Sequence, residues 1–386
     1  MRRENRALQG IPIALLRFVR LAPIAALSLV LTTAALAQNT TILAYHEVDP
    51  LPERGWAVSS EDFAEQMRYL AITGYNVIPI AALADYVNGK RSSLPPNSVV
   101  ITSDDGWLCN YTVMAPILKR LGFPWSLYVY PKIVGEGSHA LTWSQIEQLS
   151  GDGVDIESHT LSHADLLRKS HREMTDADYD KFLNSELEES RRIIESHIGH
   201  PVRFIAYPYG NYDNSVTAAA RRAGYVAGLV SWMRPNTRTT DPMKLGRVKM
   251  VSSMSLEDFR SALGAAALQW HDLLPANEGV LASGQLTLSA SLDDPQLDPA
   301  SIRATLLSGT PVDTAYDAAS HRLTLTLATK PREERQRVVV QATNAQGVRT
   351  IGIWTFFMSS TAQGRYAELK SKMAKLPMQD AATPQP

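Results

Sequence analysis

The sequence contains a single cysteine, Cys109, in 386 residues, so no internal disulfide can form. Lysines and arginines are scattered and form no basic tract, which argues against a nucleic-acid-binding protein. No G-x-S-x-G motif occurs, which disfavours a serine hydrolase of the nucleophile-elbow type, and we find no internal repeat. The remaining composition, 45% hydrophobic and 20% charged, is that of a globular chain with room for one large domain and one smaller domain.

Residues 1–37 differ from the rest of the chain. Five arginines precede the apolar run Leu21–Leu31, and Ala35-Leu36-Ala37 stands before Gln38. This pattern is typical of a secretory signal that is cleaved after Ala37, and it predicts export to the periplasm or the extracellular space. A retained membrane anchor is the alternative, but it needs about 20 apolar residues, and this run is interrupted by polar residues and a proline. After cleavage we expect no membrane span and 33 basic against 38 acidic residues.

Between residues 38 and 270, strand-like runs alternate with helical patterns. Apolar runs at 41–46, 99–102, 125–130 and 154–158 are separated by stretches with helical spacing, one of which begins at a Ser60 cap and another at a Thr142–Gln145 capping box. We count about seven or eight βα units. This α/β pattern predicts a distorted or incomplete (β/α) barrel as the catalytic domain.

From residue 278 to residue 358 the helical spacing gives way to period-two alternation. The segment predicts a small all-β sandwich of immunoglobulin-like type without its disulfide, which would contact a glycan or a protein. Its expected strands are 285–291, 302–307, 322–327, 337–342 and 349–357. Residues 359–386 predict a short helix followed by a disordered tail.

Polar side chains follow two of the buried strands. Asp104 and Asp105 end the apolar run that begins at Ser98, and His159 and His163 follow the run that ends at Ser158. Because parallel sheets carry their chemistry at the carboxyl ends of strands, these four side chains are candidates for one site. The alternative for the aspartates is an acidic turn that uses Gly106.

Histidines four residues apart point the same way if they share a helical turn, and this is metal-ligand spacing. With Asp105 as the third ligand, they form a set suited to a catalytic divalent ion. Zinc is the expected ion, although nickel, cobalt or iron would accept the same donors. Asp104 would then be the general base for a water molecule that the metal acidifies. A glycosidase fits less well, because its two carboxylates must flank the scissile bond.

Three motifs together resemble the polysaccharide deacetylases of carbohydrate esterase family 4, the NodB-homology family. They are Thr102–Gly106, the pair His159 and His163, and Tyr207–Gly210. The resemblance spans about residues 41–265. It implies a metal-dependent N- or O-deacetylase with Asp104 as base, with Asp105, His159 and His163 as metal ligands, and with the backbone N–H of Tyr209 in an oxyanion hole.

The opening Ala44-Tyr45-His46-Glu47-Val48 is similar to the permuted branch typified by biofilm poly-N-acetylglucosamine deacetylases, which implies that His46 is the general acid. Two departures stand out. Ser103 occupies the place of the family's usual phenylalanine, and the arginine expected just before Pro208 is displaced to Arg203. We expect Arg247 to pair with Asp104 instead.

Three aromatic residues near these motifs are candidates for stacking on sugar rings or for core packing: Trp107, Tyr209 and Trp232. The sequence as a whole predicts an exported deacetylase acting on acetylated polysaccharide, with N-acetyl groups of amino sugars favoured. The alternative is a non-catalytic carbohydrate-binding or polysaccharide-export assembly protein that retains the fold.

Overall fold

The computed structural model describes residues 39–358, apart from 168–170, 172, 232–233, 283, 295, 330 and 332–334. The predicted signal segment, the predicted tail and Trp232 therefore lie outside the described residues. Within the described ranges, no helix has the length and apolar character needed to cross a membrane.

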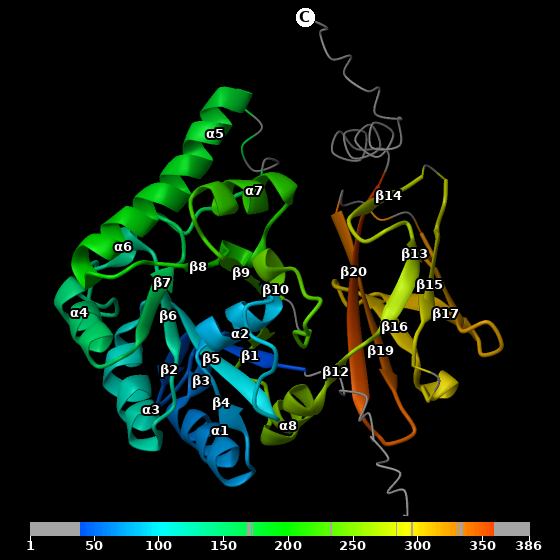
Figure 1. The fold of residues 1–386 in the computed structure, drawn as a ribbon, viewed down its shortest axis with the longest axis horizontal. Helices are drawn as coiled ribbons and strands as arrows, with labels where there is room; N and C mark the ends of the chain where they lie inside the picture. The colour runs from blue at the N-terminus through cyan, green and yellow to red at the C-terminus, as the bar shows by residue number, and fades with distance from the viewer. Residues whose placement is uncertain are drawn as a thin grey trace, which may run out of the picture. The chain divides into compact units, whose positions relative to one another are not determined.

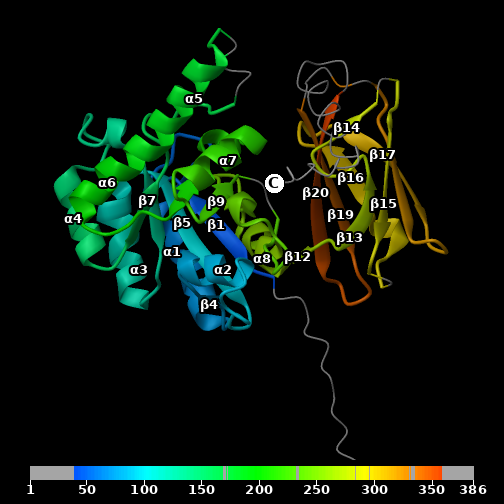
Figure 2. The same cartoon turned by 45° about the horizontal axis from the view of Figure 1, so that its top comes forward.

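A sheet of nine parallel strands forms the first part of the described chain (Figures 1 and 2). Eight strands follow the order β10-β9-β8-β7-β6-β5-β1-β11, and β4 pairs with β5. Their bounds are β1 (Thr41–Tyr45), β4 (Asn76–Val77), β5 (Ser98–Asp105), β6 (Ser126–Val129), β7 (Asp155–Ser158), β8 (Phe204–Ala206), β9 (Ala227–Val230), β10 (Leu245–Gly246) and β11 (Val248–Lys249).

The two edges of this sheet are joined through one short segment. Leu245 of β10 pairs with Leu229 on one edge, and Val248 of β11 pairs with Leu43 on the other. Arg247 lies between these two strands. The sheet is therefore a nearly closed barrel, which confirms the predicted fold class.

Helices follow the strands of the barrel. Their bounds are α1 (Ser60–Ile72), α2 (Ile80–Val87), α3 (Ala115–Leu121), α4 (Trp143–Gly151), α5 (Asp176–Asn184), α6 (Ser190–Ile198), α7 (Asn214–Arg222) and α8 (Leu256–Gly264). The Thr142–Gln145 capping box of α4 is confirmed. The predicted Ser60 cap is wrong by one residue, because the Ser59 side chain accepts the Asp62 N–H and Ser60 begins α1.

Two π-helical turns interrupt these helices, η1 (Asn110–Met114) before α3 and η4 (Ser185–Glu189) between α5 and α6. Short 3₁₀ turns complete this part of the chain: η2 (Pro131–Ile133), η5 (Pro208–Gly210) and η6 (Pro242–Lys244). A two-stranded ribbon pairs β2 (Glu47–Asp49) with β3 (Ala57–Ser59). Because π turns are rare and concentrate at functional sites, η1 and η4 mark segments of functional interest.

Side chains on the two faces of the barrel strands pack in different apolar clusters. On β5, Val99 and Ile101 pack in the larger cluster with α1, α3, α4, α7 and α8, whereas Val100 packs in a smaller cluster with α2. Ile42, Tyr128 and Phe204 belong to the same smaller cluster. Since successive side chains of a strand alternate in direction, residues 100, 102 and 104 share the inner face of the barrel.

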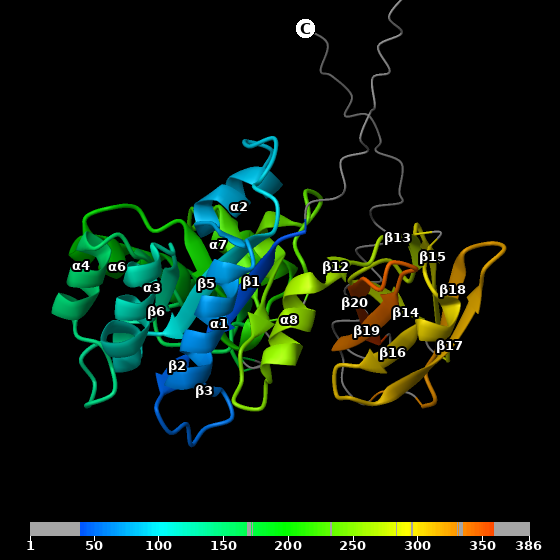
Figure 3. The ribbon, with the colours of Figure 1, turned by 90° about the horizontal axis from the view of Figure 1, so that it is seen from below.

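A second, mostly antiparallel sheet follows, as predicted (Figure 3). Its order is β12-β20-β19-β16-β17-β18-β15-β13, with β14 beside β20 and a 3₁₀ turn, η7 (Pro299–Ser301), before β16. The bounds are β12 (Ala266–Ala267), β13 (Trp270–Leu274), β14 (Gly279–Leu281), β15 (Thr287–Leu292), β16 (Arg303–Leu306), β17 (Pro311–Asp317), β18 (Arg322–Thr326), β19 (Arg335–Thr343) and β20 (Arg349–Met358).

The five expected strands of this region correspond to β15, β16, β18, β19 and β20. Within 278–358 the prediction missed β14 and β17. In β17 only one of seven residues is buried, and its sequence PVDTAYD shows no sustained alternation. The immunoglobulin-like topology and the domain boundaries remain predictions. Residues 266–267 already pair with β20 of the second sheet.

Candidate active site

Asp104 lies on the inner face of the barrel at the carboxyl end of β5 and is almost fully buried. Arg247 binds both of its carboxylate oxygens: Nη1 donates to Oδ1 and Nη2 donates to Oδ2, each at 2.7 Å. Arg247 is itself 0% exposed. The expected contact between Arg247 and Asp104 is thus a bidentate buried ion pair, held by the segment that closes the barrel.

The charge state of Asp104 follows from this pair. Burial alone would raise its pKa, but the Arg247 guanidinium and the neighbouring histidines bring the pKa well below the ordinary value. Asp104 is therefore an ionised acceptor at neutral pH. Its Oδ2 lies 3.9 Å from Nε2 of His46 and 3.9 Å from Nε2 of His159, so it stands between the two imidazoles.

His46 follows β1, the neighbour of β5 in the sheet. Burial lowers the pKa of His46 to about 4, against the opposing charge of Asp104. The imidazole is therefore neutral in the resting protein at pH 7. Its Nδ1 is buried and has no hydrogen-bond partner among the described residues, while Nε2 faces Asp104.

Asp105, His159 and His163 converge on one point. Oδ1 of Asp105 lies 3.6 Å from Nε2 of His159 and 3.6 Å from Nε2 of His163, and the three candidate ligand atoms lie within 4.8 Å of one another. Nδ1 of His159 lies 2.6 Å from the carbonyl oxygen of Ala206, a contact that leaves Nε2 free to bind a metal. The structure thus brings together the three residues predicted as ligands.

The donor set fits a divalent ion. Zinc bonds to nitrogen and oxygen measure about 2.0–2.2 Å, so two ligands of a tetrahedral ion lie about 3.3–3.6 Å apart. The two separations of 3.6 Å between Asp105 and the histidines agree with this spacing. Burial lowers the pKa of His159 to about 4 and also lowers that of His163, so both imidazoles are neutral, as ligation requires. Burial raises the pKa of Asp105, a cost that a bound cation would offset.

His159 and His163 do not share a helical turn, contrary to the sequence interpretation. The segment after β7 is irregular, and Thr160 and His163 have left-handed backbone angles, with φ of +67° and +59°. Asp105 and Tyr209 are also left-handed, with φ of +77° and +59°. Such conformations cost about 1–3 kcal/mol each in non-glycine residues and persist where the surroundings impose them. The two histidines converge because of this strained loop.

Ser103 lies on the opposite face of β5 from Asp104 and is fully buried. Nδ2 of Asn110, in the η1 turn, donates to Oγ of Ser103 at 2.8 Å, and that hydroxyl donates to the carbonyl oxygen of His46 at 3.3 Å. Sequence reasoning missed Asn110, since a single asparagine near a helix start carries no signal of its own. Ser103 thus connects the backbone of His46 to the helix behind β5.

The other candidate residues have varied surroundings. Trp107 donates from Nε1 to Oδ2 of Asp105 at 3.1 Å, and the Arg54 guanidinium lies 5.2 Å from its ring centre. Tyr209 is 60% exposed, and its ring centre lies 4.8 Å from that of His163. Arg203 lies over the ring of Phe204 rather than against Asp104. Tyr209 is therefore an exposed aromatic side chain beside the candidate metal ligand His163.

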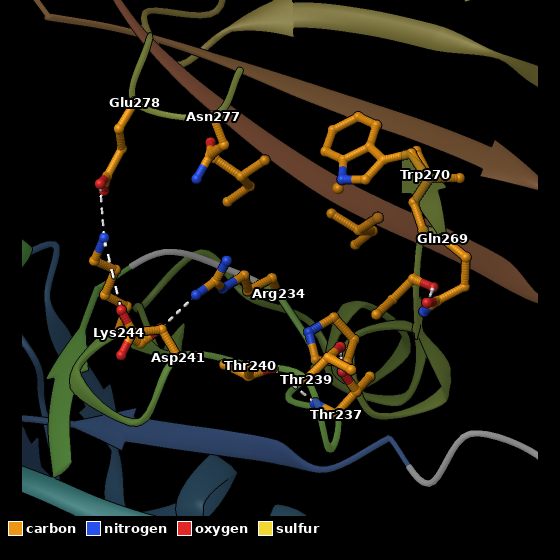
Figure 4. Close-up of a pocket in the computed structure, with 16 residues that line it drawn as sticks. Arg234, Thr237, Thr239, Thr240, Asp241, Lys244, Gln269, Trp270, Asn277 and Glu278 are labelled. Atoms are coloured by element: carbon orange, nitrogen blue, oxygen red, sulfur yellow. Dashed lines mark hydrogen bonds and ion pairs between the residues drawn. The ribbon is translucent and has the colours of Figure 1, made fainter. Parts of the chain in front are cut away.

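A cavity of about 480 Å³ lies elsewhere in the described residues, lined by parts of 234–244, 267–278 and 351–353 (Figure 4). Lys244 Nζ lies 2.7 Å from a carboxylate oxygen of Glu278 and 3.8 Å from one of Asp241. None of the three candidate metal ligands lines this cavity. It is therefore separate from the candidate active site.

Comparison with known proteins agrees with the motifs. Residues 91–228 match the family model described as polysaccharide deacetylase. The Bacillus subtilis protein YxkH, named as a polysaccharide deacetylase, is 28% identical over 225 residues, covering 58% of this chain and 74% of that protein. The poly-beta-1,6-N-acetyl-D-glucosamine N-deacetylase of Staphylococcus epidermidis is 22% identical over 244 residues, covering 58% and 81%.

Among solved structures, the Streptococcus pyogenes deacetylase PplD in complex with acetate has a similar fold. The TM-score is 0.53 at 21% identity, over 59% of this chain and 99% of that chain. The motifs lie in the barrel, and residues 91–228 of that barrel match the polysaccharide deacetylase family model.

Proposed function

We propose that this protein is an exported, metal-dependent deacetylase that hydrolyses acetyl groups of polysaccharides, with N-acetylated amino sugars favoured over O-acetyl esters. One observation carries the proposal. A complete ligand set for a divalent ion, Asp105, His159 and His163, stands beside a second, ionised carboxylate, Asp104, that Arg247 holds in place. A protein that only binds glycan has no need of a carboxylate held ionised in its interior.

The side chains would divide the proton transfers of amide hydrolysis. The ion, with zinc as first expectation, would acidify a water molecule and polarise the acetyl carbonyl. The water oxygen bonds to the acetyl carbon while Asp104 accepts the water proton. That proton passes to Nε2 of His46, 3.9 Å from Asp104, and then to the sugar nitrogen as the C–N bond breaks. The products are acetate and a free amine.

This sequence of transfers explains how His46 can be an acid although its resting form is neutral. A histidine with a pKa of about 4 is in its neutral form at pH 7, with one ring nitrogen unprotonated, so it would gain its second proton within each catalytic cycle. Asp104 would be the proton source, since its Oδ2 lies 3.9 Å from Nε2 of His46 and the proposed mechanism gives it the water proton. The backbone N–H of Tyr209 would donate to the developing oxyanion.

Acetate release from metal-loaded full-length protein tests the proposal. The substrates would be poly-N-acetylglucosamine, chitin oligomers, peptidoglycan and acetylated xylan, with the bound metal quantified. We expect Asp104→Asn to lower kcat by about 10²–10⁴-fold, the usual contribution of a general base. The matched control is Asp152→Asn, since Asp152 is an exposed carboxylate paired with Lys119 at 2.9 Å.

Equal acetate release by the wild type and Asp104→Asn would contradict the assignment of the base. Glycan binding without acetate release from any substrate would favour the non-catalytic alternative. A glycan or protein contact through the second sheet, and export by the segment 1–37, remain predictions that this assay does not address.

A further inference from the structure

The loop that carries His163 is held by a helix from another part of the chain. Thr160 and His163 both have left-handed backbone angles, and strain of this kind persists only where neighbouring groups impose it. Within the loop, the N–H of His163 donates to Oγ1 of Thr160 at 3.1 Å. Further contacts that define the loop come from Glu186 and Ser190.

Glu186 accepts three hydrogen bonds from this loop. Its Oε2 accepts the backbone N–H groups of Leu161 at 3.1 Å and of Ser162 at 2.9 Å, and its Oε1 accepts the hydroxyl of Ser162 at 2.6 Å. The side chain is buried, with 5% exposure. One buried side chain thus holds two backbone N–H groups and one hydroxyl of the loop.

Ser190 supplies a second anchor one turn later. Its hydroxyl donates to the carbonyl oxygen of Thr160 at 2.9 Å and lies 2.9 Å from Oγ of Ser158. Oγ of Ser158 in turn accepts the N–H of Thr160 at 3.2 Å. The backbone around Thr160 is thus fixed at both its N–H and its carbonyl group.

The two anchors sit at a local irregularity of their helix. Figure 1 shows α5 and α6 as one long helix, and the π-helical turn η4 lies between them. Glu186 lies within this turn and Ser190 directly follows it. A π turn adds a residue to the helical repeat and changes which side chains share a face, and such turns recur at functional sites. The hydrogen bonds of both side chains go to the loop rather than to the candidate ligand atoms.

We propose that Glu186, supported by Ser190, is a positioning residue that holds the His159–His163 loop in its metal-binding shape. The inference rests on the proposed metal site and extends it to a group that does not touch the ion. Without the Glu186 carboxylate the strained loop relaxes, and Nε2 of His163 moves away from Asp105. Groups that orient a metal ligand without binding the ion change metal affinity by about 10–100-fold.

Metal titration tests the proposal directly. Zn²⁺ and Co²⁺ are titrated calorimetrically into metal-free full-length wild type and Glu186→Gln. Glutamine removes the carboxylate and keeps only one acceptor oxygen for the three hydrogen bonds that the loop donates. We expect a dissociation constant about 10–100-fold weaker for Glu186→Gln, with a changed Co²⁺ absorption spectrum. The matched control is Glu188→Gln, two residues away on the same turn and exposed, which should bind like the wild type.

Other variants distinguish an error in the proposed metal site from an error in the positioning role of Glu186. If His163→Ala binds metal as tightly as the wild type, the proposed metal site is wrong and the inference falls with it. If His163→Ala is weakened but folded Glu186→Gln binds within twofold of the wild type, the metal site stands and only the positioning role is overturned. A residue that merely stabilises the fold would lower Tm and leave the affinity unchanged. Should Glu186→Gln fail to fold, Ser190→Ala carries the same test, with weaker binding again expected and wild-type affinity overturning the proposal.

Discussion

The two sheets of this protein bury different chemistry. The barrel encloses Asp104, Glu157, His159 and Arg247, all at most 2% exposed. In the described part of the chain from residue 266 on, the buried polar residues are uncharged, namely Gln336, Thr350 and Thr355. The core of the second sheet is otherwise apolar, with Leu323, Leu325, Val338, Val340, Trp354 and Phe356 among its members. Within the described residues, the buried ionisable side chains of Asp, Glu, His and Arg thus all lie before residue 266, among the strands and helices of the barrel.

The difference is physical as well as functional. Taking a charge out of water is costly, and a buried ion pair is often no more stabilising than apolar residues of similar size. The Asp104–Arg247 pair therefore has no advantage for folding alone. Four of the left-handed non-glycine residues, Asp105, Thr160, His163 and Tyr209, also lie at the carboxyl ends of the barrel strands. The unfavourable free energies of the buried ion pair and of these backbone angles thus occur where we propose that the reaction takes place.

Breaking the buried ion pair between Asp104 and Arg247 should have the largest effect on both stability and acetate release. Arg247→Met leaves the Asp104 carboxylate buried and unpaired, so we expect about 3–5 kcal/mol less stability together with loss of acetate release. Urea denaturation and the acetate assay measure the two effects. The control is Arg322→Met, since the Arg322 guanidinium donates to the hydroxyls of Ser289 and Ser291 within the second sheet and its loss should leave acetate release intact.

A double variant tests whether the Asp104–Arg247 ion pair is needed for activity and not for stability. Asp104→Leu combined with Arg247→Met removes both charges, and we expect it to recover stability relative to Arg247→Met while remaining inactive. A double variant no more stable than Arg247→Met alone would show that the pair contributes to folding in its own right. The contrast between the two sheets would then lose its basis.

A substitution that creates a cavity in the core of the second sheet should lower the stability of the protein without changing its metal affinity. Leu323 is 0% exposed, and Leu323→Ala should cost about 2–5 kcal/mol through lost burial and the cavity left behind. Metal affinity, measured on protein that remains folded, should equal that of the wild type. A parallel loss of metal affinity would show that the two sheets are coupled and that their roles are not separate.

The smallest effect concerns Cys109, a reactive type of side chain that the proposed mechanism does not use. Its Sγ accepts the N–H of Val48 at 3.2 Å, and burial raises its pKa to about 11. The thiol therefore stays protonated at pH 7–8, and thiolate forms only as the pH rises toward 11. Alkylation by iodoacetamide, followed by mass spectrometry, should be slow at about pH 8 in native protein and fast in urea. Rapid labelling of the native protein under the same conditions would show that the Cys109 thiol is neither buried nor held in its protonated form.

Much of the site could be predicted because it depends on short-range patterns. Asp104 and Asp105 end a β-branched run, and the histidines follow another, so the strand ends alone located them. The interpretation of the histidine pair was nevertheless wrong in its local geometry. Spacing alone cannot distinguish a helical turn from a strained loop, since the loop depends on distant partners such as Glu186.

The strand ends also show the limit of sequence reasoning. The run from Ser98 to Asp105 by itself specified a buried strand with two carboxylates at its end, because alternation and β-branching are local properties. Their separate orientations arise from contacts far along the chain. Arg247 reaches Asp104 because β10 and β11 close the barrel, and Asn110 reaches Ser103 because a π turn packs behind β5. Hydrogen bonds between distant segments depend on how strands and helices pack, which no short stretch of sequence encodes.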